Sequence, residues 1–177
     1  MRIIPILILS LMILLSSCKK IDKLTNFYIP IEEELIVNPS EADDFIIDSW
    51  LFIAQITEVG YFADYNTSVE ATDKIALSEF NITLKSPDDQ TLQFIESVEI
   101  YFVNAVDDPL KVAWLDEIPE SATNKVELNF ISDNLKDRII TRENVVNVRL
   151  KAKSIVNVDI TLQLNYSFYI SSELNGS

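Results

Sequence analysis

The chain has 177 residues, 48% of them hydrophobic, and its 28 Asp and Glu against 14 Lys and Arg give a formal charge of −14. Such acidity repels nucleic acid and anionic lipid headgroups, so neither is an expected partner. The absence of histidine, with one cysteine and two glycines, excludes Ser-His-Asp and Cys-His catalysis, ordinary zinc sites and glycine-rich phosphate loops.

The N-terminus combines Arg2, an apolar run over residues 3–15 and the small residues Ser16 and Ser17 before Cys18. A positive start, an apolar stretch of about 7–15 residues and small residues at the cut are typical of a secretory signal. The run is shorter than the roughly 20 apolar residues that cross a bilayer.

Residues Leu15-Ser16-Ser17-Cys18 resemble the lipobox of bacterial lipoproteins, and Cys18 is the sole cysteine of the chain. The resemblance implies cleavage before Cys18, a diacylglyceryl thioether on its sulfur and acylation of the new amino group. More than one acyl chain is what stable anchoring requires. The alternative is an ordinary secreted protein in which the cysteine stands at the cut by chance.

The resemblance also implies a location in the bacterial cell envelope. In well-studied diderm bacteria an Asp after the cysteine retains a lipoprotein in the inner membrane, and here the next residue is Lys19. We therefore expect a lipid anchor in the outer membrane, followed by a polar tether up to residue 26.

Beyond the tether, alternation of apolar and polar residues is the dominant pattern. It is clearest over residues 156–170, where every second residue is apolar, and it indicates a long strand with one buried face. The partner in a strand pair is expected at residues 145–153. Further strands are predicted at residues 27–37, 44–57, 75–85, 98–102, 111–115 and 126–130. For residues 44–57 the alternative is a helix that begins with the apolar run at 45–47.

One short helix is predicted at residues 133–140, because Leu135 and Ile139 share a face and Ser132 or Asp133 can cap its start. A helix placed between strands in this way is expected to close one end of the fold.

Seven or eight strands with one buried face each predict an all-β, antiparallel two-sheet sandwich. An eight-stranded closed barrel is the structural alternative. The predicted organisation is a signal peptide over 1–17, a lipidated cysteine and tether over 18–26, and a single domain over 27–177. By pattern alone, that domain resembles immunoglobulin-like sandwiches.

The segment 60–66 contains the aromatic residues Tyr61, Phe62 and Tyr65. They are candidates for a recognition loop, because Tyr and Phe supply large contact area at low entropic cost. The alternative is that they fold over an open end of the sandwich. Trp50 and Trp114 lie inside apolar segments and are expected in the core.

Acidic pairs at 43–44, 88–89, 107–108 and 116–117 could contribute ligands to Ca²⁺, but no spaced Asp-x-Asp-x-Asp-Gly loop is present. Solvated turns with local hydrogen bonds are the expected structure of these pairs. We expect no cofactor and no catalytic or metal site.

Three hypotheses for function remain. The first is a non-enzymatic binding or accessory module for a protein or glycan of the envelope. The second is a carrier of an apolar ligand in a cavity lined by strands 145–153 and 156–170. The third is a hydrolase that uses carboxylates alone, which needs two of them facing each other across a cleft.

Overall fold

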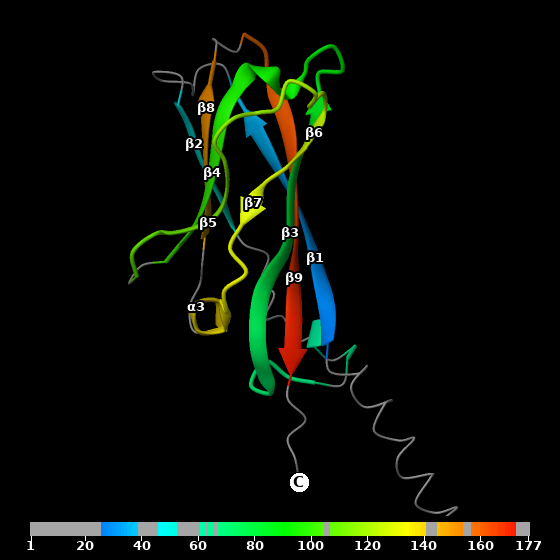
Figure 1. Ribbon diagram of the computed structural model, residues 1–177, viewed down its shortest axis with the longest axis vertical. Helices are drawn as coiled ribbons and strands as arrows, with labels where there is room; N and C mark the ends of the chain where they lie inside the picture. Colours follow the sequence, from blue (N-terminus) through cyan, green and yellow to red (C-terminus); the bar gives the residue numbers. More distant parts are fainter. Residues whose placement is uncertain are drawn as a thin grey trace, which may run out of the picture.

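The computed structural model describes residues 26–38, 46–52, 61–62, 64–65, 67–104, 107–140, 145–153 and 157–172. Within these residues the chain forms an antiparallel two-layered β-sandwich (Figure 1). The all-β prediction is therefore confirmed. The barrel is not formed, since the described strands divide between two sheets.

The first sheet has four strands in the order β1-β9-β3-β6. Their bounds are β1 Asn26–Val37, β3 Thr72–Ser86, β6 Lys125–Glu127 and β9 Ile160–Ser172. The second sheet has five strands in the order β2-β8-β4-β5-β7. Their bounds are β2 Ile46–Phe52, β4 Ile95–Val103, β5 Leu110–Leu115, β7 Asn129–Phe130 and β8 Val145–Ala152.

The strand order defines a jelly roll. Antiparallel pairs are nested along the sequence, with β1 against β9, β2 against β8, β3 against β6 and β4 against β5. A ribbon of nested pairs wrapped into two sheets is the jelly-roll arrangement. Immunoglobulin-like sandwiches share the two layers but use another strand order.

Alternation places the core between the sheets. Along β9 every second residue from Ile160 to Ser172 is buried, as the sequence pattern predicted. The strand begins at Ile160 rather than near residue 156, and Val158 is 45% exposed. Phe168 of the first sheet faces Phe102 of the second, with ring centroids 6.2 Å apart. Apolar side chains from both sheets therefore form one continuous core.

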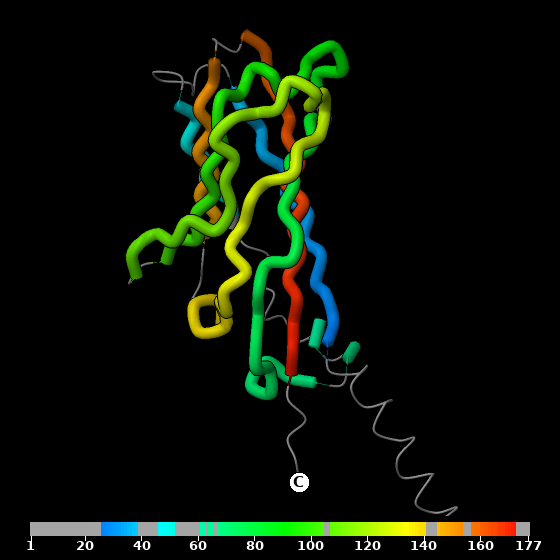
Figure 2. The backbone as a smooth tube through the Cα atoms, in the orientation of Figure 1, coloured from blue at the N-terminus to red at the C-terminus, as the bar shows by residue number. Residues whose placement is uncertain are grey.

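The predicted strand at residues 126–130 is divided between the two sheets. Val126 pairs with β3 of the first sheet, whereas Phe130 pairs with β5 of the second. Between them Leu128 is buried and its N–H donates to the Phe80 carbonyl at 2.9 Å. In Figure 2 this yellow segment passes from one layer to the other, so it connects the sheets along one side of the sandwich.

The helix α3 spans Lys136–Ile140 and begins later than predicted. Its first N–H donates to Asn134 Oδ1 at 3.0 Å, so Asn134, rather than Ser132 or Asp133, satisfies the helix start. Asn134 Oδ1 also accepts from the N–H of Ile75 in β3, while Arg138 donates to the Phe102 carbonyl at the end of β4. The helix therefore joins the two sheets at one end of the sandwich, as expected.

Candidate functional site

The residues predicted for recognition lie at the end of the sandwich where β1 begins. Phe62 is 2% exposed and meets Phe27 edge-on at 5.7 Å, and Tyr65 stacks on the same Phe27 at 4.1 Å. Tyr61 is half-buried against the core. These contacts are those of a loop that folds over an open end, although Tyr65 remains 43% exposed. Cys18 lies outside the described residues.

Trp50 occupies an unexpected place. It is 58% exposed on β2, which corrects its predicted place in the core. The cause is the alternation of side chains along a strand. Ile47 of β2 points into the core, so Asp48 and Trp50, one and three positions later, point outward. Asp48 was the signal that could have revealed this, because a charged residue two positions from Trp50 indicates that both face water.

Trp114 lies on the same outward face. It pairs across β5 and β4 with Glu99, and directly paired residues of antiparallel strands share a face. Its side chain is half-buried. Both tryptophans of the chain therefore lie outside the core, on the outer side of one sheet.

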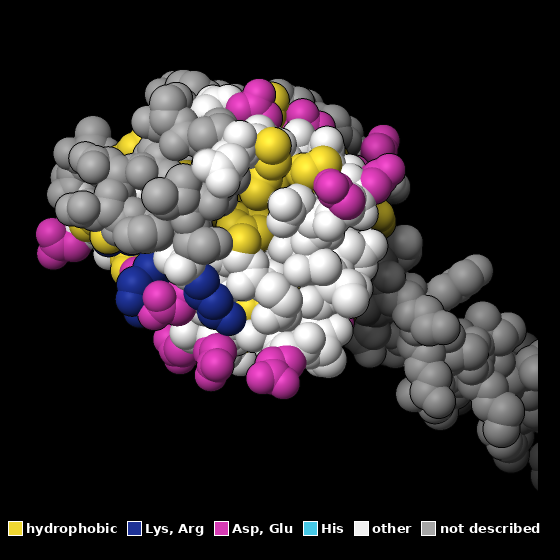
Figure 3. All heavy atoms as spheres, turned by 90° about the horizontal axis from the view of Figure 1, so that it is seen from above, with side chains coloured by type: hydrophobic (Ala, Val, Ile, Leu, Met, Phe, Trp, Pro, Cys, Tyr) yellow, Lys and Arg dark blue, Asp and Glu magenta, His cyan; other side chains and the backbone are white. Residues whose placement is uncertain are grey.

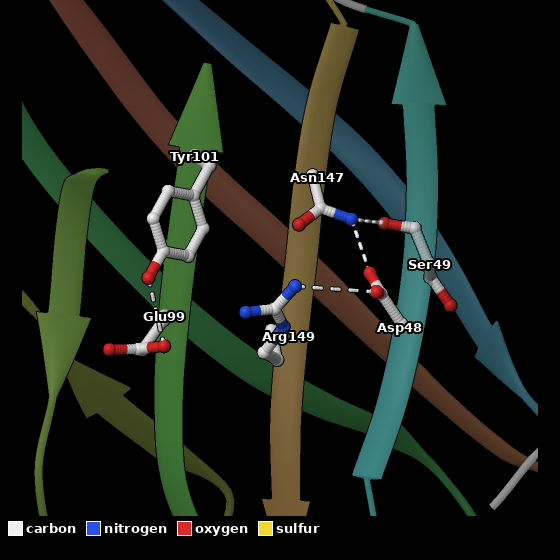
Figure 4. A network of polar contacts seen from close by, with 6 residues as sticks. All are labelled: Asp48, Ser49, Glu99, Tyr101, Asn147 and Arg149. Atoms are coloured by element: carbon white, nitrogen blue, oxygen red, sulfur yellow. Dashed lines mark hydrogen bonds and ion pairs between the residues drawn. The ribbon is translucent and has the colours of Figure 1, made fainter. Parts of the chain in front are cut away.

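Two rows of side chains cross this outer face, and Figure 4 shows their members other than Trp50. One row runs from Trp50 through Asn147 to Tyr101, and the next from Asp48 through Arg149 to Glu99. The rows bring together β2, β8 and β4, segments that lie far apart in the sequence. The register of the strands, and not any local motif, assembles this group.

Asn147 stands at the centre of the group and is 3% exposed although it faces outward. Its Nδ2 donates to the carboxylate of Asp48 and, at 3.4 Å, to the carbonyl of Ser49. Arg149 reaches the second oxygen of Asp48 at 3.5 Å and lies over the Tyr101 ring, 5.6 Å from its centroid. These contacts hold the planar side chains in fixed positions.

Glu99 connects the group to β5. Its two carboxylate oxygens accept from Lys111 Nζ at 2.8 Å and from the Tyr101 hydroxyl at 3.0 Å. The hydrogen bond from Lys111 is the main reason that the pKa of Glu99 lies below its usual range. Partial burial, followed by the nearby Glu99 carboxylate, raises the pKa of Tyr101. Glu99 is therefore ionised at neutral pH, which is unsuitable for a general acid.

The strands of this sheet carry no net charge. Each of their acidic side chains is paired with a basic one: Glu99 with Lys111, Asp48 with Arg149 and Glu96 with Lys151. The strands of the first sheet contain six acidic residues against three basic ones. The outer face of the second sheet is thus locally neutral on a strongly acidic molecule.

We name this surface the Trp50 face and define it by Asp48, Trp50, Glu99, Tyr101, Trp114, Asn147 and Arg149. It offers two indole rings, one phenol and several planar polar groups on one side of a sheet. None of its members was predicted as a site residue, because only the pairing of distant strands brings them together.

Of the acidic pairs that the structure describes, Asp88 and Asp89 lie in a turn, whereas Asp107 and the pair at 116–117 lie at bends. Asn104 and Asp107 exchange two hydrogen bonds, at 2.9 and 2.7 Å. Among the described residues no group of three or more potential metal-binding side chains is found. The pair at 43–44 lies outside those residues.

The larger buried apolar residues of the two strands predicted to line a carrier cavity belong to the packed core. One of these core residues, Tyr166, has a polar group. Tyr166 stacks on Phe80 at 5.0 Å, and its hydroxyl is buried without a hydrogen-bond partner among the described residues. Burial, followed by the charge of Glu33, raises the pKa of Tyr166. Glu33 itself lies half-buried on β1.

No protein-family model matches the chain, and no curated protein matches it by sequence. Its structural neighbours include Desmodium yellow mottle tymovirus, at 11% identity over 86% of this chain and 91% of that chain with a TM-score of 0.34. Triatoma virus shows 12% identity over 85% and 66% of the two chains, with a TM-score of 0.42. Likeness this distant carries no functional argument. Within the described part of the chain, no helix is long and apolar enough to span a membrane.

Proposed function

We propose that the chain is a lipoprotein of the bacterial envelope, anchored through acyl chains on Cys18 and acting as a non-enzymatic binding module for a protein or glycan. The observation that carries the anchor is the lipobox Leu15-Ser16-Ser17-Cys18 at the end of the apolar run, with the only cysteine in the chain. Lys19 after the cysteine favours the outer membrane.

The start of the domain fits a short tether. The first strand begins at Asn26, so residues 19–25 separate it from Cys18. Seven residues at about 3.5 Å each reach about 25 Å. Because Asn26 pairs with Ser171, the end that holds both residues and the Phe27–Tyr65 stack would face the membrane.

The opposite end would then point away from the membrane. Figure 3 looks down on that end, where Asp and Glu side chains stand around the rim and hydrophobic side chains lie between them. Ile36 and Val158, at the end of β1 and just before β9, are 51% and 45% exposed. The Trp50 face forms one long side of the sandwich and stays open to a partner in this orientation.

The test of the anchor is mass spectrometry of the protein purified from its native membrane, together with a Cys18→Ala variant. We expect a mature chain that starts at Cys18 and carries acyl groups, found in outer-membrane vesicles. The variant should leave the membrane fraction. An unmodified thiol, or a chain that still starts at Met1, would refute the anchor.

A carrier of an apolar ligand is the second candidate, and the Tyr166 hydroxyl favours it. A buried donor without a partner inside an apolar layer is a point at which the polar end of a lipid could bind. Native mass spectrometry of the purified protein distinguishes the two functions, because only a carrier would retain stoichiometric lipid that is not covalently bound.

A further inference from the structure

The outer face of the second sheet differs from the described strands of the first sheet in two ways: both tryptophans are there, and its charges cancel. We propose that the Trp50 face binds an uncharged glycan, with Trp50 as the ring on which a sugar stacks. This inference rests on the proposed binding function and identifies the surface and the ligand class.

Trp50 supplies the apolar contact. Its indole is 58% exposed and is not part of the core. Asp48, two positions earlier on the same face of β2, is exposed as well. A pyranose ring has one face of C–H groups and a rim of hydroxyls, so it can cover an indole while its hydroxyls remain hydrogen-bonded. Large aromatic rings bind such amphipathic partners at low entropic cost.

The polar groups around Trp50 suit the sugar rim. Asp48, Arg149 and Asn147 already contact one another, which reduces the cost of ordering them around a ligand. Their carboxylate and carboxamide oxygens retain lone pairs, and the guanidinium has five N–H donors. Hydroxyls both donate and accept, which matches a surface where the two kinds of group alternate.

Charge selects the class of ligand. The chain carries −14 overall, whereas the ion pairs of this sheet cancel locally. An anionic ligand is repelled by the molecule at large, and a cationic one finds each acidic side chain of these strands already paired with a basic one. A neutral polyhydroxyl ligand encounters neither obstacle.

Size favours a glycan over a folded protein. Three strand spacings separate β2 from β5, and the Asp48 and Trp50 rows lie one two-residue step apart, so the footprint is about 14 by 7 Å. That is about 100 Å², against about 800 Å² on each side of a standard protein interface. Trp50 and Trp114 lie at opposite corners of this area, so a short oligosaccharide could contact both.

The experiment uses the lipidated protein in a detergent without a sugar headgroup. Neutral hexasaccharides of glucan, xylan, mannan and chitin type are titrated while tryptophan emission and heat are recorded. We expect at least one to shift the emission to shorter wavelength. Trp50→Ala should weaken binding at least tenfold and Trp50→Phe less, in variants whose circular dichroism matches that of the wild type.

Tyr28→Ala is the matched control, because Tyr28 is also 58% exposed but lies on β1 in the other sheet. It should leave binding unchanged. The proposal is overturned if no neutral hexasaccharide binds at millimolar concentration, if Tyr28→Ala weakens binding as much as Trp50→Ala, or if polygalacturonate binds in preference.

Two results separate this inference from the proposed function. If a protein cross-linked in intact cells is lost with Trp50→Ala while no glycan binds, the glycan is wrong and the binding module stands. If Cys18 carries no lipid, the envelope anchor fails regardless of the sugar titration.

Discussion

Asn147 donates from its carboxamide to the carboxylate of Asp48, across the pair formed by β8 and the edge strand β2. Both residues face outward, yet Asn147 is 3% exposed, with Trp50 and Tyr101 opposite it on the two neighbouring strands. A covered carboxamide needs partners inside the protein, and this one finds them on β2. The contact therefore helps to fix the register of an edge strand that has one neighbour in its sheet.

Replacing Asn147 by Ala should lower the free energy of unfolding by about 1–2 kcal/mol, because a buried hydrogen bond to a charged group is lost. Denaturant unfolding of the full chain measures the change. Asn129→Ala is the control: Asn129 is exposed on β7, and its replacement should change the free energy by less than about 0.5 kcal/mol. Equal effects of the two substitutions would contradict the assignment.

The Glu99–Lys111 pair should give a pH-dependent contribution to stability. The folded-state pKa of Glu99 is lowered, so the contribution is present above the ordinary pKa of about 4.3 and is lost as the pH falls through the folded value. Both side chains are about one-third exposed or more, which limits the contribution to at most about 1 kcal/mol.

The measurement compares wild type with Glu99→Gln, which cannot titrate. The wild type should be the more stable at pH 7, and the two proteins should converge once the pH falls below the lowered folded-state pKa of Glu99. Added salt should reduce the difference at pH 7. A difference that grows on acidification would show that the sign of the shift is wrong.

Tyr166 should tolerate loss of its hydroxyl but not of its ring. Because the hydroxyl is buried without a partner among the described residues, Tyr166→Phe removes an uncompensated polar group and should leave stability unchanged or raise it by about 1 kcal/mol. Tyr166→Ala should cost about 3–5 kcal/mol, since the ring packs against Phe80 and Phe168. A loss of more than 1 kcal/mol in Tyr166→Phe would indicate a bound partner for the hydroxyl.

The two layers of the fold could be predicted from the sequence because the alternation of apolar and polar residues shows which face of each long strand is buried. Alternation along β9 and β8 needs only local information. β8 formed close to its predicted bounds, and β9 kept its predicted alternation although it begins four residues later, at Ile160. Strand order is not local information. The pairing of Asn26–Val37 with Ile160–Ser172 joins the two ends of the domain. Neither segment contains a sequence signal that identifies the other as its partner.

The candidate site was missed because it depends on the pairing of distant strands, and because Trp50 was assigned to the wrong face of its strand. Trp50 was counted as apolar and assigned inward, although Asp48 two positions earlier marks the same face as wet. The division of residues 126–130 between sheets was also hidden, because Val126, Leu128 and Phe130 alternate regularly through the crossing. Aromatic residues follow either face of a strand, so charged neighbours are the better guide to orientation.

The aromatic loop offers a test that separates packing from recognition. Phe62→Ala should lower the free energy of unfolding by about 3–5 kcal/mol, because the ring is buried against Phe27. Tyr65→Ala should cost only about 1 kcal/mol, the value of an exposed stacked pair. Thermal or denaturant unfolding measures both, and Tyr28→Ala, whose ring meets Tyr169 at 5.5 Å, is the matched surface control.

The same variants also test binding. If the loop only closes the end of the sandwich, Tyr65→Ala will retain full glycan affinity while Trp50→Ala loses it. If Tyr65→Ala instead keeps its stability and loses the ligand, recognition resides at the end of the domain near the tether. In that case the Trp50 face would be an ordinary solvated sheet surface, because one small ligand cannot reach both places at once.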